Sequence, residues 1–282
     1  MSVAVPDSRI AAGHAPFDAV ADRYDESFTH SLIGRAQRRQ VWQELDRVFA
    51  PGQRILEINC GTGVDAVHLA ARGVEVWACD SSSRMLEVAR RRVESAWLAA
   101  DVHLHPVATE QLQSLRPGGS FDGAFSNFGG LNCVEDLNAV ARNLASMLKP
   151  AAPVVLCLMG RYVAWEMIWF TLHGRPGKAV RRLRNQPIHV RLGNGSVLCW
   201  YRSVQDLRRA FRPYFRLRSW RGVGLSVPPS YLERQAGQFP GIMKTLERAD
   251  AYLGRMPFVR GLADHLLLTF ERCCTRVGDC AA

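Results

Sequence analysis

Two glycines and an acidic residue form a pattern that binds nucleotide-like ligands. Gly61 and Gly63 follow the short apolar run 54–59, and a helix-like segment begins at Val64. In such a turn, backbone N–H groups and a helix N-terminus face the ligand, and only glycine lets the ligand approach closely. Asp80 ends the next apolar run, at a spacing suited to ribose hydroxyls. The pattern also matches the dinucleotide fingerprint G-x-G-x-x-A, so a nicotinamide-dependent oxidoreductase is one interpretation.

Wider strings around these residues resemble the Class I methyltransferases of the small-molecule type, which use S-adenosylmethionine. Residues 57–63, EINCGTG, are similar to the family's acidic residue followed by G-x-G-x-G, with Asn59 in place of the first glycine. Asparagine enters left-handed backbone conformations more readily than most residues. Residues 80–86, DSSSRML, resemble the segment in which an aspartate holds the ribose and a methionine packs near the adenine. The resemblance implies cofactor contacts from Glu57, Asn59, Gly61, Gly63, Asp80, Ser81 and Met85.

The fourth-strand motif of the family points to the reaction centre. Residues 121–128, FDGAFSNF, resemble that motif, which ends beside the methionine part of the cofactor and the acceptor. The resemblance implies that Asn127 and Phe128 face the reacting groups, and that Asn127 also contacts the cofactor. Both are therefore candidates for the catalytic site.

Two more segments complete the resemblance. Residues 17–25, FDAVADRYD, resemble an N-terminal helix that closes over the cofactor, which implies that Tyr24 approaches the carboxylate or the sulfonium of S-adenosylmethionine. Tyr24 is thus both a cofactor-binding and a catalytic candidate. Near the end of the third strand the family often has an acidic residue that contacts the adenine amine. Glu110 is the candidate here, although it is displaced from the usual position.

Alternating apolar strands and helices predict the fold that positions these residues. Strands are expected at 54–59, 74–79, 102–106, 121–125, 153–159, 215–225 and 265–271, and helices at 36–49, 64–72, 83–94, 135–148 and 203–211. Apolar strands joined by helices are typical of a parallel sheet covered on both faces. We therefore expect an α/β, Rossmann-like, mostly parallel sheet of about seven strands, with an antiparallel last strand and helical cap insertions.

A chain of 282 residues with 48% apolar content fits one α/β domain with embellishments. The expected organisation is an N-terminal helical cap (1–45), a cofactor-binding core (46–160), an insertion (161–202), a closing helix and strands (203–272) with a helical insertion (228–262), and a tail (273–282). Tyr162, Trp165, Trp169 and Phe170 give the first insertion an aromatic stripe at helical spacing. This stripe is ordinary core, part of the acceptor pocket, or a contact with a membrane surface.

The net charge of +10 permits an anionic partner. A basic surface suits nucleic acid, an anionic membrane or an acidic substrate. The chain lacks the alternating aromatic and basic pattern of RNA-binding modules, which argues against nucleic acid. An RNA methyltransferase that uses the basic surface is kept as an alternative.

Other partners are constrained by what the sequence lacks. Arg161 and Glu166 interrupt the most apolar region, 153–172, before it reaches the roughly 20 residues that span a bilayer. The N-terminus, 1–18, has no signal-peptide pattern. We therefore predict a cytoplasmic chain without a transmembrane segment, with peripheral membrane contact left open. The histidines and cysteines show no metal-ligand spacing, so no metal is predicted, and nothing specifies an oligomeric state.

Methyl transfer from a sulfonium requires an acceptor lone pair held in line with the methyl group. Positioning in a closed, dry pocket supplies much of the acceleration, so a strong base is optional. We predict a small, partly apolar acceptor, and the methylated atom is oxygen, nitrogen, sulfur or carbon. No tyrosine is followed four residues later by lysine, which argues against a short-chain dehydrogenase. A non-catalytic protein that binds S-adenosylmethionine is a further alternative.

Overall fold

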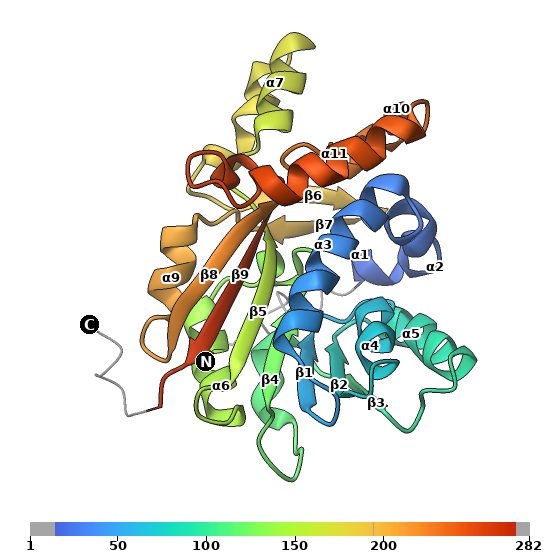
Figure 1. Cartoon of the computed structure of the whole chain (residues 1–282), viewed down its shortest axis with the longest axis vertical. Helices are drawn as coiled ribbons and strands as arrows, with labels where there is room; N and C mark the ends of the chain where they lie inside the picture. The colour runs from blue at the N-terminus through green and yellow to red at the C-terminus, as the bar shows by residue number, and fades with distance from the viewer. Residues whose placement is uncertain (1–14, 194, 275–282) are drawn as a thin grey trace, which may run out of the picture.

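The computed structural model describes residues 15–193 and 195–274. Its main sheet has seven strands in the order β3-β2-β1-β4-β5-β9-β8 (Figure 1). The strands are β1 (Arg54–Ile58), β2 (Glu75–Asp80), β3 (Val102–Pro106), β4 (Gly123–Ser126), β5 (Pro153–Met159), β8 (Phe215–Val223) and β9 (His265–Arg272). β9 runs antiparallel to β5 and β8, whereas β1 to β5 pair in parallel. The predicted Rossmann-like sheet with an antiparallel last strand is confirmed.

Helices cover both faces of the sheet. One face packs against α3 (Leu32–Val48), α4 (Val64–Ala70) and α5 (Ser83–Ser95), and the other packs against α6 (Leu137–Met147) and α9 (Val204–Phe211). The side chains of β5 alternate between the hydrophobic cores on the two faces of the sheet. Val154, Leu156 and Leu158 lie in the core on the α6 side, and Val155 and Cys157 lie in the core on the α3 side. This alternation is what a strand buried on both faces requires.

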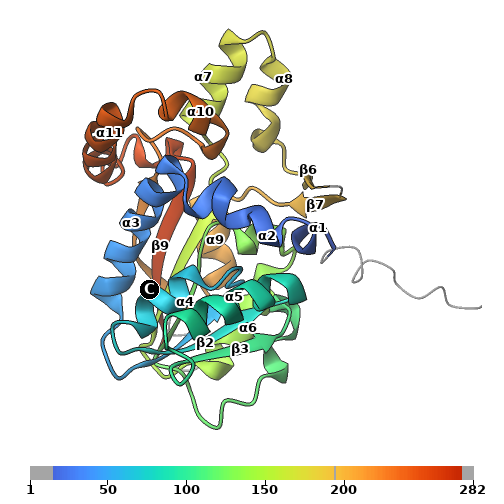
Figure 2. The same ribbon diagram turned by 90° about the vertical axis from the view of Figure 1, so that its right-hand side faces the viewer.

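Both insertions lie beyond the carboxyl ends of the parallel strands (Figures 1 and 2). The first consists of α7 (Ala164–Leu172), α8 (Pro176–Ala179) and a separate hairpin of β6 (Ile188–Leu192) and β7 (Gly195–Cys199). The second contains α10 (Glu233–Ala236) and α11 (Pro240–Leu253). In Figure 2, α7 and α8 project above the rest of the molecule, and α1 (Ala15–Asp18) and α2 (Ala21–Tyr24) lie beside the hairpin.

The predicted elements are present, with shifted ends. α3 begins at Leu32 rather than at 36 because the Ser31 side chain accepts a hydrogen bond from the Gly34 N–H and caps the helix. α3 then continues to Val48, across the expected boundary between residues 45 and 46. Residues of the N-terminal segment thus form part of the layer that covers the sheet.

Candidate cofactor and acceptor site

The glycine turn between β1 and α4 takes left-handed backbone conformations. Asn59, Gly61 and Gly63 have φ angles of 59°, 53° and 73°. The expectation that Asn59 enters this region is confirmed. A Cβ at Gly63 would lie 2.9 Å from the Ala89 Cβ, so Gly63 permits close packing of α4 on α5. A Cβ at Gly61 would meet nothing within 4 Å, so Gly61 leaves open space in front of the turn.

Asp80 joins the ends of β1 and β2. Its carboxylate oxygens accept hydrogen bonds from the Gly61 N–H at 2.8 Å and the Ser82 N–H at 2.9 Å. Ser82 in turn caps α5 by accepting from the Met85 N–H at 3.1 Å, and Met85 is buried. Ser81, between Asp80 and Ser82 in the chain, is half-buried. The Asp80 carboxylate therefore lies at the cofactor turn, where the family resemblance puts the ribose.

Glu57 is buried at the end of β1, and its Oε2 atom has no hydrogen-bond partner in the described ranges. Burial raises its pKa well above the usual value; Asp65 and Asp80 add to the increase, and Arg38 opposes it. A buried carboxyl oxygen without a hydrogen bond is unfavourable unless a cationic or hydrogen-bonding group compensates it. S-adenosylmethionine carries a sulfonium and an ammonium, so this site fits that cofactor.

An ion pair that the sequence did not reveal lies behind the turn. The Arg38 Nη1 atom is 2.6 Å from Asp65 Oδ1. Trp42 Nε1 donates to the same oxygen, and Asn127 Nδ2 donates to Asp65 Oδ2 at 2.8 Å. Burial acts to raise the pKa of Asp65, but Arg38 and the other donors outweigh it and lower the pKa. Asp65 therefore fixes α3 and the end of β4 to the cofactor turn.

Phe128 has a strained backbone and a central ring. Its φ angle is 46°, which is uncommon for a bulky residue. Its N–H donates to Asn127 Oδ1 at 2.9 Å, so both ends of the Asn127 amide are engaged in shaping this turn. The Phe128 ring lies 4.9 Å from Phe28, 5.4 Å from His265 and 4.7 Å from the Arg38 guanidinium. Such clustered strain is common at functional sites.

The N-terminal segment lies over the cofactor turn. Thr62 Oγ1 donates to Asp25 Oδ1 at 2.8 Å, and Arg92 forms an ion pair with the same carboxylate. Ser82 Oγ donates to Asp18 Oδ1 at 2.5 Å. Tyr24, next to Asp25, packs 6.0 Å from Phe28; burial raises its pKa, and Arg38 opposes the increase. The structure thus brings Tyr24 and Phe128 close to the same ring, that of Phe28.

Glu110 lies at the rim of this site. It is exposed in the 3-10 helix Thr109–Ser114, next to Thr109, whose Oγ1 accepts from Asn59 Nδ2 at 3.0 Å. A contact between Glu110 and the adenine amine stays a prediction.

Residues 15–193 and 195–274 contain no group of three or more His, Cys, Asp or Glu side chains that could hold a metal. No helix in these ranges is long and apolar enough to cross a bilayer.

Known proteins share this architecture. Residues 55–151 match a family model described as a methyltransferase domain. The demethylmenaquinone methyltransferase of Clavibacter sepedonicus is 37% identical over 145 residues, which cover 51% of this chain and 56% of that protein. Its counterpart in Paenarthrobacter aurescens is 30% identical over 191 residues, which cover 65% and 70%. Geranyl diphosphate C-methyltransferase of Streptomyces coelicolor, solved with Mg²⁺, geranyl diphosphate and S-adenosyl-L-homocysteine, has a TM-score of 0.53 at 14% identity, covering 83% of this chain and 79% of that one.

The sheet order and the glycine turn define a Rossmann-like α/β protein. The chain belongs to the Class I methyltransferase family, as its motifs implied. It spans little more than half the length of the Clavibacter relative. The family assignment favours S-adenosylmethionine over a nicotinamide cofactor.

Proposed function

We propose that this chain transfers a methyl group from S-adenosylmethionine to a small, partly apolar acceptor. The observation that carries the proposal is the buried Glu57 Oε2 atom, which has no hydrogen-bond partner in the described ranges, on the strand that leads into the open turn at Gly61. Asp80 would hold the ribose, and Glu57 would compensate the positive charge of the methionine part. Asn59, Gly61 and Gly63 would shape the turn around the cofactor; Ser81, Met85 and Glu110 would flank the adenosine.

The residues of the chain would act by binding, positioning and excluding water. When bound, S-adenosylmethionine supplies an electrophilic methyl group. Tyr24, Phe28 and Phe128, whose rings lie close together, would line the approach to it, and Asn127 accepts a hydrogen bond from the Phe128 N–H. An acceptor held in line in such an apolar enclosure needs little further activation. The relatives named for demethylmenaquinone support an apolar ring compound as the acceptor.

Calorimetric titration of the purified protein tests the cofactor. We expect micromolar binding of S-adenosylmethionine and S-adenosylhomocysteine and none of NADH. Asp80→Ala should weaken binding roughly 10- to 100-fold, because hydrogen bonds to a charged group contribute about 1.5–3 kcal/mol. Asp101→Ala, at an exposed aspartate before β3, serves as the control. Binding of NADH alone, or equal affinities in the two variants, would refute the cofactor assignment.

A helical projection formed by residues 161–187 supports contact with an anionic membrane surface. Ile168 and Leu172, four residues apart on α7, are 59% and 78% exposed, whereas Trp165 and Trp169 pack against the second insertion. The basic residues of the projection are Arg161, Arg175, Lys178, Arg181, Arg184 and the buried Arg182. Its single acidic residue, Glu166, is paired with Arg181 and Arg182. Exposed apolar side chains among basic ones fit an anionic bilayer.

Sedimentation with lipid vesicles tests this contact. The wild type should bind phosphatidylglycerol vesicles and not phosphatidylcholine vesicles. The Ile168→Ser, Leu172→Ser double variant should lose binding, whereas Trp97→Ser, at a 93% exposed aromatic residue away from the projection, should keep it. Salt-sensitive binding of RNA instead would favour the alternative of an RNA methyltransferase. A cytoplasmic location stays a prediction.

A further inference from the structure

Two polar side chains, Gln37 and His265, are buried in the segments that meet at this end of the sheet. Both amide atoms of Gln37, on α3, are without hydrogen bonds in the described ranges, and the residue is 0% exposed. His265, at the start of β9, is 6% exposed, and its Nδ1 atom has no hydrogen-bond partner in the same ranges. Buried polar groups in folded proteins nearly always have partners. The Gln37 amide therefore needs a water or a ligand as its partner.

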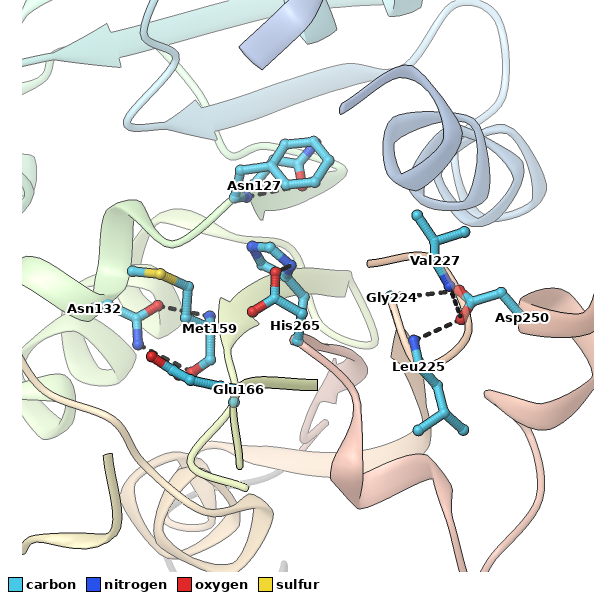
Figure 3. A network of polar contacts seen from close by, with 12 residues as sticks. Asn127, Asn132, Met159, Glu166, Gly224, Leu225, Val227, Asp250 and His265 are labelled. Atoms are coloured by element: carbon cyan, nitrogen blue, oxygen red, sulfur yellow. Dashed lines mark hydrogen bonds and ion pairs between the residues drawn. The ribbon is translucent and has the colours of Figure 1, made fainter. Parts of the chain in front are cut away.

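Both residues lie at the ligand edge of the sheet. His265 pairs in register with Met159, the last residue of β5, and its ring lies 5.4 Å from that of Phe128, at 88°. Gln37 lies beside Gly224 and Asp264, since a Cβ at Gly224 would be 2.6 Å from Gln37 Nε2 and 3.2 Å from the Asp264 Cβ. Figure 3 shows His265 between the Asn127 turn and the Glu166 side chain. Open α/β sheets bind ligands at this edge.

The charged side chains near His265 pair with one another. Asp264 Oδ1 is 3.3 Å from Arg182 Nη2, and Arg181 and Arg182 both pair with Glu166. Asp264 Oδ2 lies 3.4 Å from His265 Nδ1, which favours a proton on Nδ1 and leaves the lone pair on Nε2. Burial lowers the pKa of His265, Asp264 opposes the decrease, and Arg182 adds to it. His265 is thus a neutral imidazole at pH 7, able to accept a proton.

We propose that Gln37 and His265 bind the hydroxyl group of an aromatic methyl acceptor, and that His265 takes the hydroxyl proton during transfer. The proposal rests on the proposed function and deepens it by naming the acceptor class. The O–H bond breaks, and its proton passes to His265 Nε2. The electron pair left on the ring system forms the new bond to the methyl carbon, while the methyl–sulfur bond breaks and its pair stays on sulfur. His265 returns its proton to solvent after product release.

Binding of 1-naphthol to the protein saturated with S-adenosylhomocysteine tests this subsite. We expect His265→Gln and Gln37→Leu each to weaken 1-naphthol binding about tenfold or more, the loss of one buried hydrogen bond. Their affinity for S-adenosylhomocysteine should be unchanged, which also shows that they fold. His189→Gln, at an exposed histidine of β6, is the matched control. Wild-type affinity for 1-naphthol should fall at acidic pH, once the pH drops below the lowered pKa of His265, and His265→Gln should lose this dependence.

The outcomes separate this inference from the proposed function. Tight binding of S-adenosylhomocysteine with no 1-naphthol binding, or with 1-naphthol affinity equal in the wild type and both variants, overturns the inference alone. A wild type that does not bind S-adenosylhomocysteine overturns the proposed function and the inference together. If one variant fails to bind S-adenosylhomocysteine, the other variant and the pH dependence of the wild type decide.

Discussion

Removal of the Asp250 carboxylate should cost the protein a large part of its stability. Asp250, on α11, is fully buried and accepts hydrogen bonds from backbone N–H groups of the loop that follows β8 (Figure 3). The distances are 2.8 Å from Gly224, 2.5 Å from Leu225 and 2.5 Å from Ser226. Gln40 of α3 donates to the same carboxylate at 2.6 Å. The second insertion, the sheet and α3 thus meet at one side chain.

The size of the effect follows from the donors that Asp250→Ala leaves behind. Each buried donor without a partner costs about 1–3 kcal/mol, and because such costs are not additive we expect a loss of about 3–6 kcal/mol. Urea denaturation followed by circular dichroism measures it. Asp136→Ala is the control, because Asp136 also accepts from two backbone N–H groups, those of Asn138 and Ala139, but is exposed. Its loss should cost about 1 kcal/mol.

The comparison between the two aspartates is decisive. A cost for Asp250→Ala no greater than that for Asp136→Ala would refute the reasoning, because burial of the donors would then have no energetic weight. A large cost with unchanged affinity for S-adenosylhomocysteine below the transition would show that Asp250 supports the cap rather than the cofactor.

Three further predictions concern the site. Because burial raises the pKa of Glu57, the wild type should lose stability as pH rises above 4.5. Glu57→Gln should remove this loss and stabilise the free protein by about 1–3 kcal/mol at pH 8. The same variant should bind S-adenosylmethionine more weakly. Equal denaturation midpoints at pH 5 and pH 8 in both proteins would contradict it. Gly61→Ala should abolish cofactor binding at a cost of only about 1–2 kcal/mol of backbone strain. Gly63→Ala should destabilise the fold more, because its Cβ would lie 2.9 Å from the Ala89 Cβ. Calorimetry and thermal denaturation measure the two effects, and a larger loss of stability for Gly61→Ala than for Gly63→Ala would contradict the prediction. Because burial lowers the pKa of His265, the imidazole is protonated more readily in the unfolded chain than in the folded protein. Stability should therefore fall as pH drops from 6.5 to the pKa of His265 in the folded protein. Urea denaturation at several pH values should show a weaker pH dependence for His265→Gln, and an unchanged pH dependence would contradict the prediction.

Local patterns in the sequence predicted the sheet and the cofactor turn, because strand periodicity and the glycine motif involve neighbouring residues. The left-handed conformation of Asn59 followed from its residue type and its place in the glycine motif. No local pattern encodes contacts between segments that are far apart in the chain. Such contacts are the Arg38–Asp65 pair, the hydrogen bonds to Asp250 and the proposed Gln37–His265 subsite. His265 in particular reads only as the first residue of an apolar strand. Its place beside Phe128 depends on β9 entering the sheet antiparallel to β5.

The N-terminal segment has a kinetic consequence. Its aspartates are anchored on the residues that follow β1 and β2: Asp25 on Thr62 and Arg92, and Asp18 on Ser82. A nucleoside seated against Gly61 would leave only after these contacts open, so its residence time would be governed by the segment as well as by its own contacts. Ion pairs near the surface weaken as salt is added. Product exchange should therefore quicken with ionic strength, and turnover would be regulated by the medium around the protein.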